Sequence, residues 1–286
     1  NTLADTSKFH AALNNVVAGE ENLVKATATG AAYNSKDVAT AGTVSYTGVA
    51  LAGAEAGNYT LAATTAQGAG TISRRALTVG EVTAQSKTYD GTTAADTSKF
   101  QATLGNLVAG EEGSVTATAT GAAYNSKDVR AANTVGYTGV ALGGTGAGNY
   151  TLAASTAQGA GTISRRELTL GAVAAQTKTY DGTTAADAGK FRAALTNAIA
   201  GDSVAATATG AAYNSKDVAG ANTVNYTGVA LGGADAGNYT LAVGAAQGTG
   251  SITQRALTLG TVAAQSKTYD GTTAADTATF RATLDN

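Results

Sequence analysis

Few residues of this chain have the types and spacing that catalysis requires. The only histidine is His10, and the equivalent positions in later copies of the same sequence pattern hold Gln or Arg, which is typical of an exposed side chain. Two carboxylates, Asp90 and Asp96, are close enough in sequence for acid–base chemistry. A turn at Asp90 and a helix cap at Asp96 explain them more simply. The sequence therefore predicts a protein that is not an enzyme and has no catalytic residues.

A metal ion would have to be bound by oxygen ligands, because the chain has no cysteine and a single histidine. Asp90, Asp96 and Asp128 recur in the repeats described below, but no D-x-D-x-D-G loop brings three carboxylates onto one ion. The glycine run at 143–150 resembles a phosphate loop, yet its copies replace the glycines with Ala, Glu or Asp. We expect no metal site and no cofactor, with calcium as the alternative.

The composition indicates several small cores and no strongly charged partner. The net charge of the 286 residues is −2 and only 13% of them are charged, which argues against nucleic acid as a partner. Alanine contributes much of the 43% apolar share, and 6% of residues are aromatic, so each core is expected to be small. No apolar run reaches roughly 18 residues, and we expect no membrane insertion. The absence of methionine and of a signal-peptide pattern leads us to expect a piece of a longer protein.

The sequence repeats at a nearly fixed interval. The decapeptide KTYDGTTAAD occurs three times, with its tyrosine at positions 89, 180 and 269, intervals of 91 and 89 residues. GAAYNSKDV and AGNYTLA recur at the same intervals. A unit of about 90 residues has the size of a small domain. We predict a partial repeat lacking its first strand at 1–75, complete repeats at 76–166 and 167–255, and the start of a fourth repeat at 256–286.

Within a repeat, hydrophobic alternation predicts strands. Residues 114–120 alternate Val and Ala with Ser and Thr, and 149–155 place Tyr, Leu and Ala on one face, which is the period of a half-buried strand. We interpret 161–180 as one long strand or two strands broken at Gly171, and 96–108 as either a short helix or another strand. The predicted fold is mainly β: tandem small β-rich modules, β-sandwich or β-grasp-like, that form an elongated rod.

The Tyr-Asp-Gly tripeptide is interpreted as a structural turn that recurs because the module recurs. Its tyrosine would anchor a core, because aromatic residues are scarce and each lies beside Val or Leu. Its aspartate suits a turn, and its glycine relieves backbone strain there. The tyrosines of GAAYNSKDV and AGNYTLA are expected to be buried as well. The structural turn and core candidates are Tyr89, Asp90, Gly91, Tyr180, Asp181, Gly182, Tyr269, Asp270, Gly271, Tyr124 and Tyr150.

Three other motifs have structural interpretations. The pair Arg74–Arg75 and its copy Arg165–Arg166 lie between modules, where ion pairs are expected. A Lys–Asn isopeptide crosslink between Lys127 and Asn149 is a minor alternative. Asn-Tyr-Thr matches the glycosylation sequon, but a turn asparagine before a strand is the preferred interpretation. These sequons begin at Asn58, Asn149, Asn225 and Asn238.

KTYDGTTAAD, together with GAAYNSKDV, GVALGGADAGNYTLA and GTISRRALTL, resembles the YDG-type repeat of filamentous-haemagglutinin-like bacterial adhesins, which are exported by two-partner secretion. The resemblance covers essentially the whole chain. It implies extracellular shaft modules with small β-rich folds, and it carries no catalytic residues onto this sequence.

Two functions follow as hypotheses. The first is a non-catalytic structural shaft of a large secreted bacterial surface or biofilm-matrix adhesin, whose partners are neighbouring repeats of the same chain and like chains in a fibre. The alternative is a set of repeats that bind glycan or matrix polysaccharide multivalently. Exposed tyrosines at equivalent positions would favour glycan binding, and buried ones the shaft. Either function places the protein outside the cell, on the bacterial surface or in a secreted matrix.

The two ends of the sequence are complementary in their repeat content. Residues 1–75 are expected to lack the strand that 256–286 contain. We therefore expect Ala256–Asp270 of one segment to complete the open edge of the next by strand addition. The alternative is that 256–286 folds back onto the third repeat.

Overall fold

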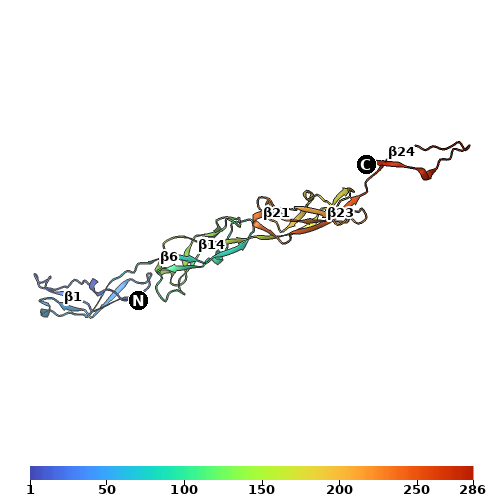
Figure 1. Cartoon of the computed structure of the whole chain (residues 1–286). Helices are drawn as coiled ribbons and strands as arrows, with labels where there is room; N and C mark the ends of the chain where they lie inside the picture. Colours follow the sequence, from blue (N-terminus) through green and yellow to red (C-terminus); the bar gives the residue numbers. More distant parts are fainter. Residues whose placement is uncertain (286) are drawn as a thin grey trace. The chain divides into compact units, whose positions relative to one another are not determined.

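The computed structural model describes residues 1–285, and Asn286, the end of the predicted fourth repeat, lies outside the described residues. The chain divides into two compact units. Unit 1 comprises Asn1–Ser86, Thr93–Ser126 and Ala132–Thr162, and unit 2 comprises Lys87–Thr92, Lys127–Ala131 and the residues from Ile163 onward. The prediction of a mainly β chain with tandem repeats is confirmed (Figure 1). Within residues 1–285, no helix is long and apolar enough to cross a membrane.

The first repeat builds two small antiparallel sheets in unit 1. One has the strand order β2-β3-β5 and the other pairs β1 with β4. Its elements, in chain order, are the 3-10 turn η1 (Thr6–Lys8), β1 (Lys25–Thr27), β2 (Gly30–Tyr33), β3 (Thr43–Thr47), β4 (Ala50–Ala52), η2 (Ala56–Asn58) and β5 (Thr65–Ala69).

The second repeat adds a three-stranded sheet to this plan. Its sheets have the orders β10-β11-β14-β7, β13-β6-β8 and β12-β9, and β13 runs parallel to β6. Its elements are β6 (Arg75–Val82), β7 (Gln85–Thr88), η3 (Thr97–Lys99), β8 (Ala102–Gly105), β9 (Thr116–Thr118), β10 (Gly121–Tyr124), β11 (Thr134–Thr138), β12 (Ala141–Gly143), η4 (Ala147–Asn149), β13 (Tyr150–Leu152) and β14 (Thr156–Ser164).

The third repeat, in unit 2, has the same topology. Its sheets have the orders β16-β23-β20-β19, β17-β15-β22 and β18-β21, with β22 parallel to β15 and β16 parallel to β23. Its elements are β15 (Arg166–Val173), β16 (Gln176–Thr179), η5 (Ala188–Lys190), β17 (Ala193–Thr196), β18 (Ala205–Thr207), β19 (Gly210–Tyr213), β20 (Thr223–Thr227), β21 (Ala230–Gly232), η6 (Ala236–Asn238), β22 (Tyr239–Leu241) and β23 (Ala245–Thr253).

A terminal segment follows the third repeat and pairs with itself. It consists of β24 (Thr258–Val262), η7 (Thr277–Thr279) and β25 (Ala282–Asp285), and β24 pairs antiparallel with β25. The two strands form a sheet by themselves, with Leu259 opposite Leu284, so within the described residues β24 does not pair with residues 167–255. None of residues 256–285 is buried. Strand addition to another segment stays a prediction.

Alternation on the central strands produces the cores. In β20, Val224 and Tyr226 are buried while Asn225 between them is exposed, as expected for a strand with one face inward. The ring of Tyr226 packs on Phe191, with ring centroids 4.8 Å apart. The equivalent Phe100 and Tyr137 rings of the second repeat are 4.7 Å apart. The second and third repeats thus each pair their phenylalanine with a tyrosine of the central strand, whereas Tyr150 belongs to a separate core with Leu77 and Val115.

Two local predictions need correction. The segment 161–180 is neither one long strand nor two strands broken at Gly171: β14 ends at Ser164, β15 runs through Gly171 to Val173, and β16 begins at Gln176. A register shift between Leu170 and Val173 marks a β-bulge, which lets β15 continue through the glycine. The segment 96–108 is neither one helix nor one strand. It forms the single turn η3, capped by Asp96, and then β8.

Candidate functional site

Each Tyr-Asp-Gly sequence forms a tight turn that its own aspartate holds. In the second repeat, Asp90 Oδ1 accepts hydrogen bonds from the Thr92 backbone N–H at 2.9 Å, the Thr92 hydroxyl at 2.9 Å and the Lys87 ammonium at 2.7 Å. Gly91 has a φ of +78°, which a glycine adopts without strain. The turn is therefore stabilised by its own residues.

The two later copies of the turn have the same construction. Hydrogen bonds from Lys178 and Thr183 lower the pKa of the Asp181 carboxyl to about 2. Hydrogen bonds from Thr272 and Lys267 lower the pKa of Asp270. The glycines Gly182 and Gly271 have φ values of +81° and +72°. All three aspartates therefore stay ionised at neutral pH as acceptors within the turn.

The tyrosines of the predicted set differ in burial. Tyr89, Tyr124 and Tyr150 are buried, and Tyr180 is half-buried. Tyr269 is 93% exposed, which corrects its assignment as a core anchor. The physical reason is that the terminal segment supplies only the paired strands β24 and β25, and no buried side chains surround Tyr269 within the described residues.

Tyr89 belongs to a cluster of four polar groups in unit 2 that joins the second repeat to the third. The hydroxyls of Tyr89 and Tyr239 both donate to Asp202 Oδ2, at 2.8 and 2.6 Å. The two rings meet edge to face, with centroids 5.3 Å apart. The Lys127 ammonium donates to the Tyr89 hydroxyl at 3.3 Å and lies 3.7 Å from Asp235. We call Tyr89, Lys127, Asp202 and Tyr239 the tyrosine cluster.

The groups of the tyrosine cluster hold one another in fixed protonation states. Burial opposes ionisation of Asp202, but hydrogen bonds from Tyr239 and Tyr89 outweigh it and lower the pKa of its carboxyl. Burial and the bond to Asp202 raise the pKa of Tyr239 to about 12 and also raise the pKa of Tyr89. The hydrogen bond to Tyr89 raises the pKa of Lys127. At neutral pH the cluster therefore contains a carboxylate, an ammonium and two neutral phenols, which its hydrogen bonds hold together.

The turn glycine of the second repeat makes room for the third. A Cβ atom on Gly91 would lie 2.9 Å from Cγ2 of Ile199, closer than such atoms approach in proteins. Arg166, at the start of β15, donates to the Asn197 carbonyl at 2.7 Å and reaches the Tyr89 carbonyl at 3.5 Å. The Tyr-Asp-Gly turn is therefore a receptor for the loop that carries Ile199 and Asp202.

A buried asparagine completes this junction. Asn238 Oδ1 accepts a hydrogen bond from the Val129 backbone N–H at 2.9 Å, and its amide donates to Asp128 at 3.0 Å. Asn238 is only 5% exposed. In unit 1, Asn149 makes the same two bonds from the second repeat to the first, with Val38 N–H at 2.8 Å and Asp37 at 2.9 Å. We call this pair of bonds the asparagine latch.

The arginines between repeats act at the same junctions but not as predicted. Instead of forming the expected ion pairs, Arg74 donates to the Gly148 carbonyl and Arg165 to the Gly237 carbonyl, each at 3.1 Å. Both carbonyls belong to the glycine just before a latch asparagine, within the same 3-10 turn. Arginine suits this position because its guanidinium is always charged and donates in a fixed geometry. The latch and the arginine were not recognisable from sequence, since their partners are far apart along the chain.

The other predicted candidates have structural partners. The Asp96 carboxylate accepts from the Ser98 N–H at 2.9 Å and caps η3. Lys127 and Asn149, the pair considered for an isopeptide crosslink, bond to different residues: Asn149 donates to Asp37 and Lys127 donates to the Tyr89 hydroxyl. In residues 1–285, no group of three His, Cys, Asp or Glu side chains is arranged to hold a metal ion.

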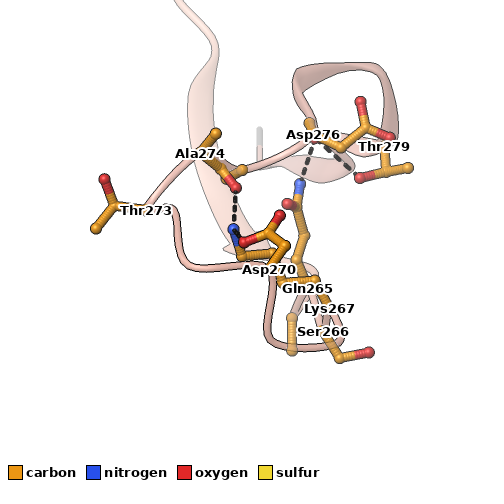
Figure 2. Close-up of a pocket in the computed structure, with 10 residues that line it drawn as sticks. Gln265, Ser266, Lys267, Asp270, Thr273, Ala274, Asp276 and Thr279 are labelled. Carbon is orange, nitrogen blue, oxygen red and sulfur yellow. Dashed lines mark hydrogen bonds and ion pairs between the residues drawn. The ribbon is translucent and has the colours of Figure 1, made fainter.

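A pocket in the terminal segment is lined by polar side chains (Figure 2). Lys267 reaches Asp270 and the Ala274 carbonyl, at 3.0 and 2.8 Å. The Gln265 amide donates to the Asp276 carbonyl at 2.9 Å. In the second repeat the equivalent glutamine, Gln85, also donates to the Tyr137 hydroxyl at 3.1 Å. The pocket thus corresponds to a core position of the complete repeats.

One protein-family model matches all three repeats. The family model described as the YDG domain matches residues 1–66, 73–158 and 164–248. A search of the curated proteins gave no match. The matched ranges contain every member of the tyrosine cluster and of both asparagine latches.

Proposed function

Because the chain belongs to the YDG domain family, we propose that it consists of non-catalytic structural shaft repeats of a large secreted bacterial surface or biofilm-matrix adhesin. Its partners are the neighbouring repeats of the same chain and like chains in a fibre, and not nucleic acid or a membrane interior. The place of action is outside the cell, on the surface or in the matrix. Two-partner secretion is the proposed export route.

The observation that carries this proposal is the chemistry of the junctions. Repeat proteins gain stability from contacts between nearest neighbours. Here those contacts are a buried latch asparagine and, in unit 2, two phenols on one carboxylate. Hydrogen bonds to a charged group are stronger than neutral ones. Such a junction transmits load between domains, which is what a shaft requires.

Multivalent binding of glycan or matrix polysaccharide is the weaker hypothesis. Sugar rings are commonly bound on exposed aromatic faces, whereas the tyrosines here are used internally. Of the 12 tyrosines, seven are buried, four are half-buried and only Tyr269 is exposed. This distribution favours the shaft.

Single-molecule stretching tests the proposal. A shaft of closed modules should unfold one repeat at a time, and a repeat of about 90 residues should release about 300 Å of contour length. We expect two such events for the second and third repeats. A gradual extension with no distinct events would overturn the shaft function, and saturable binding to a glycan array by the intact chain would support the alternative.

A further inference from the structure

The first and last segments of the third repeat run side by side in the same direction. The strand β15 pairs parallel with β22, with Arg166 opposite Tyr239. The strand β16 then pairs parallel with β23, with Gln176 opposite Gly250, and the register of the two ladders differs by one residue. The stretch 166–179 therefore follows the stretch 239–253 along the repeat. We call 166–179 the entry segment and 239–253 the exit segment.

The chain enters and leaves the repeat through these two segments. Arg165 is the single residue between β14 of the second repeat and the start of β15, and β23 ends at Thr253. Tension along the chain therefore pulls the entry segment toward its amino end and the exit segment toward its carboxyl end. Because the two segments are parallel, these pulls act in opposite directions along the strands. They load the bonds between the segments in shear.

Hydrogen bonds of both backbone and side chains cross between the two segments. At the end of the second ladder, the Tyr180 N–H donates to the Thr253 carbonyl at 2.9 Å. Within that ladder the hydroxyls of Thr177 and Ser251 are 2.8 Å apart. Under shear these bonds and the ladder bonds are loaded at the same time. They must therefore break together before the segments can slide.

Apolar packing also opposes sliding of the two segments. Leu168 of the entry segment is fully buried, and Ile252 of the exit segment is 3% exposed. A Cβ atom on Gly248 would lie 3.0 Å from Cγ1 of Val173, so the backbone of the exit segment packs directly on the entry segment. Sliding would expose these apolar groups to water, which costs free energy.

The strands between the two segments are paired differently. The pairs β18–β21 and β19–β20 are antiparallel and consist only of residues that lie between the entry and exit segments in sequence. Tension at the chain ends does not reach them while the two segments hold. The second repeat has the same plan: β13 runs parallel to β6, and the Tyr89 N–H donates to the Ser164 carbonyl at 2.9 Å.

We propose that the entry and exit segments form a mechanical clamp, which bears tension applied at the chain ends of a repeat and protects the strands between them. The inference deepens the shaft function, on which its biological role rests, because it assigns the contact that resists tension within a repeat. Bonds in shear share the load and fail together, whereas bonds pulled across the strands fail one after another. The repeat should therefore resist tension along its chain ends more strongly than tension across the parallel pair.

Stretching the same chain in two directions tests the clamp, because the chain has no cysteine to compete with introduced attachment sites. The shear geometry uses Glu167→Cys with Thr253→Cys, and the crossing geometry uses Glu167→Cys with Thr240→Cys. All three positions are exposed, and Glu167 lies opposite Thr240 in the parallel ladder. Single molecules are stretched between the two cysteines, and the rupture force reports the barrier to unfolding.

We expect a distinct rupture of the third repeat in the shear geometry, at a force that exceeds the crossing force by more than the spread within either geometry. Thr177→Val, which removes a hydroxyl contact across the clamp, should lower the shear force. The matched control Thr207→Val removes the hydroxyl bond to the Ala230 carbonyl in the inner pair β18–β21 and should leave that force unchanged.

Two results would overturn the clamp and leave the shaft function standing. One is a distinct rupture at equal force in both geometries. The other is a Thr177→Val protein that is no weaker in the shear geometry than the Thr207→Val protein. Gradual extension with no distinct rupture in the shear geometry would overturn both the clamp and the shaft function.

Discussion

The two junctions of this chain share a latch but differ in the turn that receives the next repeat. In unit 1, Asn149 closes the contact of the second repeat with the first, and in unit 2, Asn238 closes that of the third with the second. Only the junction in unit 2 also contains a Tyr-Asp-Gly turn, with Tyr89 in contact with Asp202. In unit 1 the equivalent carboxylate, Glu111, accepts from Tyr150 at 2.6 Å.

This difference shows which part of the junction is made by each repeat alone. The tyrosine–carboxylate bond is formed in all three repeats at 2.6 Å, whether or not a turn covers it. The burial of the neighbouring apolar residue follows the covering turn. Val17 is 59% exposed and Val108 is 41% exposed, whereas Ile199 is half-buried beside Gly91. The loop is thus preorganised, and the turn adds burial and one more hydrogen bond.

The largest expected effect is the difference in stability between a substitution in the Tyr-Asp-Gly turn of the second repeat, which the third repeat covers, and the same substitution in the turn of the third repeat. Replacing Tyr89 with Ala should destabilise unit 2 by about 3 kcal/mol, because a fully buried ring leaves a cavity. Tyr180→Ala, in the half-buried equivalent, should reduce the free energy of unfolding by about 1 kcal/mol or less. Urea unfolding of the two variants measures this difference, and equal losses would contradict the distinction between the two turns.

The latch predicts a graded series. Asn238→Ala should lower the free energy of unfolding by about 2 kcal/mol, because it removes the acceptor of the buried Val129 N–H bond and the donor to Asp128. Asn149→Ala, at a half-buried site, should have a smaller effect, and Asn58→Ala almost none. Thermal unfolding of the three proteins checks the order. An effect at Asn58 as large as at Asn238 would show that the asparagine acts within its own turn.

The turn glycines provide a matched pair with the same backbone strain. Both Gly91→Ala and Gly182→Ala place a side chain at positive φ, so each change should lower the free energy of unfolding by roughly 1 kcal/mol. Gly91→Ala alone should lower the free energy of unfolding by about 1 kcal/mol more, because its Cβ would clash with the side chain of Ile199. Comparing their unfolding midpoints isolates the contact with Ile199, and identical midpoints would argue that this contact is not close in solution.

Acidification gives the smallest expected effect. The pKa of Asp202 is lowered in the folded chain, so its contribution is present above the unfolded value of about 3.9 and is lost as pH falls through the folded pKa. Unfolding followed from pH 6 down to pH 2 should therefore show a loss of stability below about pH 4. The loss should be smaller in Asp202→Asn than in the parent chain. Parallel pH profiles for both proteins would contradict this role.

Sequence patterns predicted the elements whose causes are local. Residues 149–155 were predicted to form a strand with Tyr150 and Leu152 on one face, and β13 covers Tyr150–Leu152 with Tyr150 buried and Leu152 half-buried. The helix-cap interpretation of Asp96 was correct for one turn, after which Phe100 packs on Tyr137 and the chain continues as β8. The strand β8 forms because it pairs with β6, and the local sequence does not indicate that pairing.

The junction was less predictable because its partners are distant in sequence. The bond between Val38 and Asn149 joins residues 111 positions apart, and that between Tyr89 and Asp202 joins residues 113 apart. The Asn-Tyr-Thr sequence indicated a turn, yet the same three letters begin at Asn225, an exposed position of the core strand β20, and at Asn238 in the buried latch. The repeats must be folded and adjacent before these asparagines can be distinguished.

A double-mutant cycle on Tyr89 and Asp202 tests the central claim, that repeats are joined by a specific bond between a turn and a preformed loop. Tyr89→Phe, Asp202→Asn and the double variant are compared with the parent chain by urea unfolding at pH 7. We expect the two changes to be non-additive, with a coupling free energy of about 1 kcal/mol, because each variant removes the same hydrogen bond. Additive losses, with a coupling below about 0.3 kcal/mol, would show that the two groups are adjacent without joining the repeats.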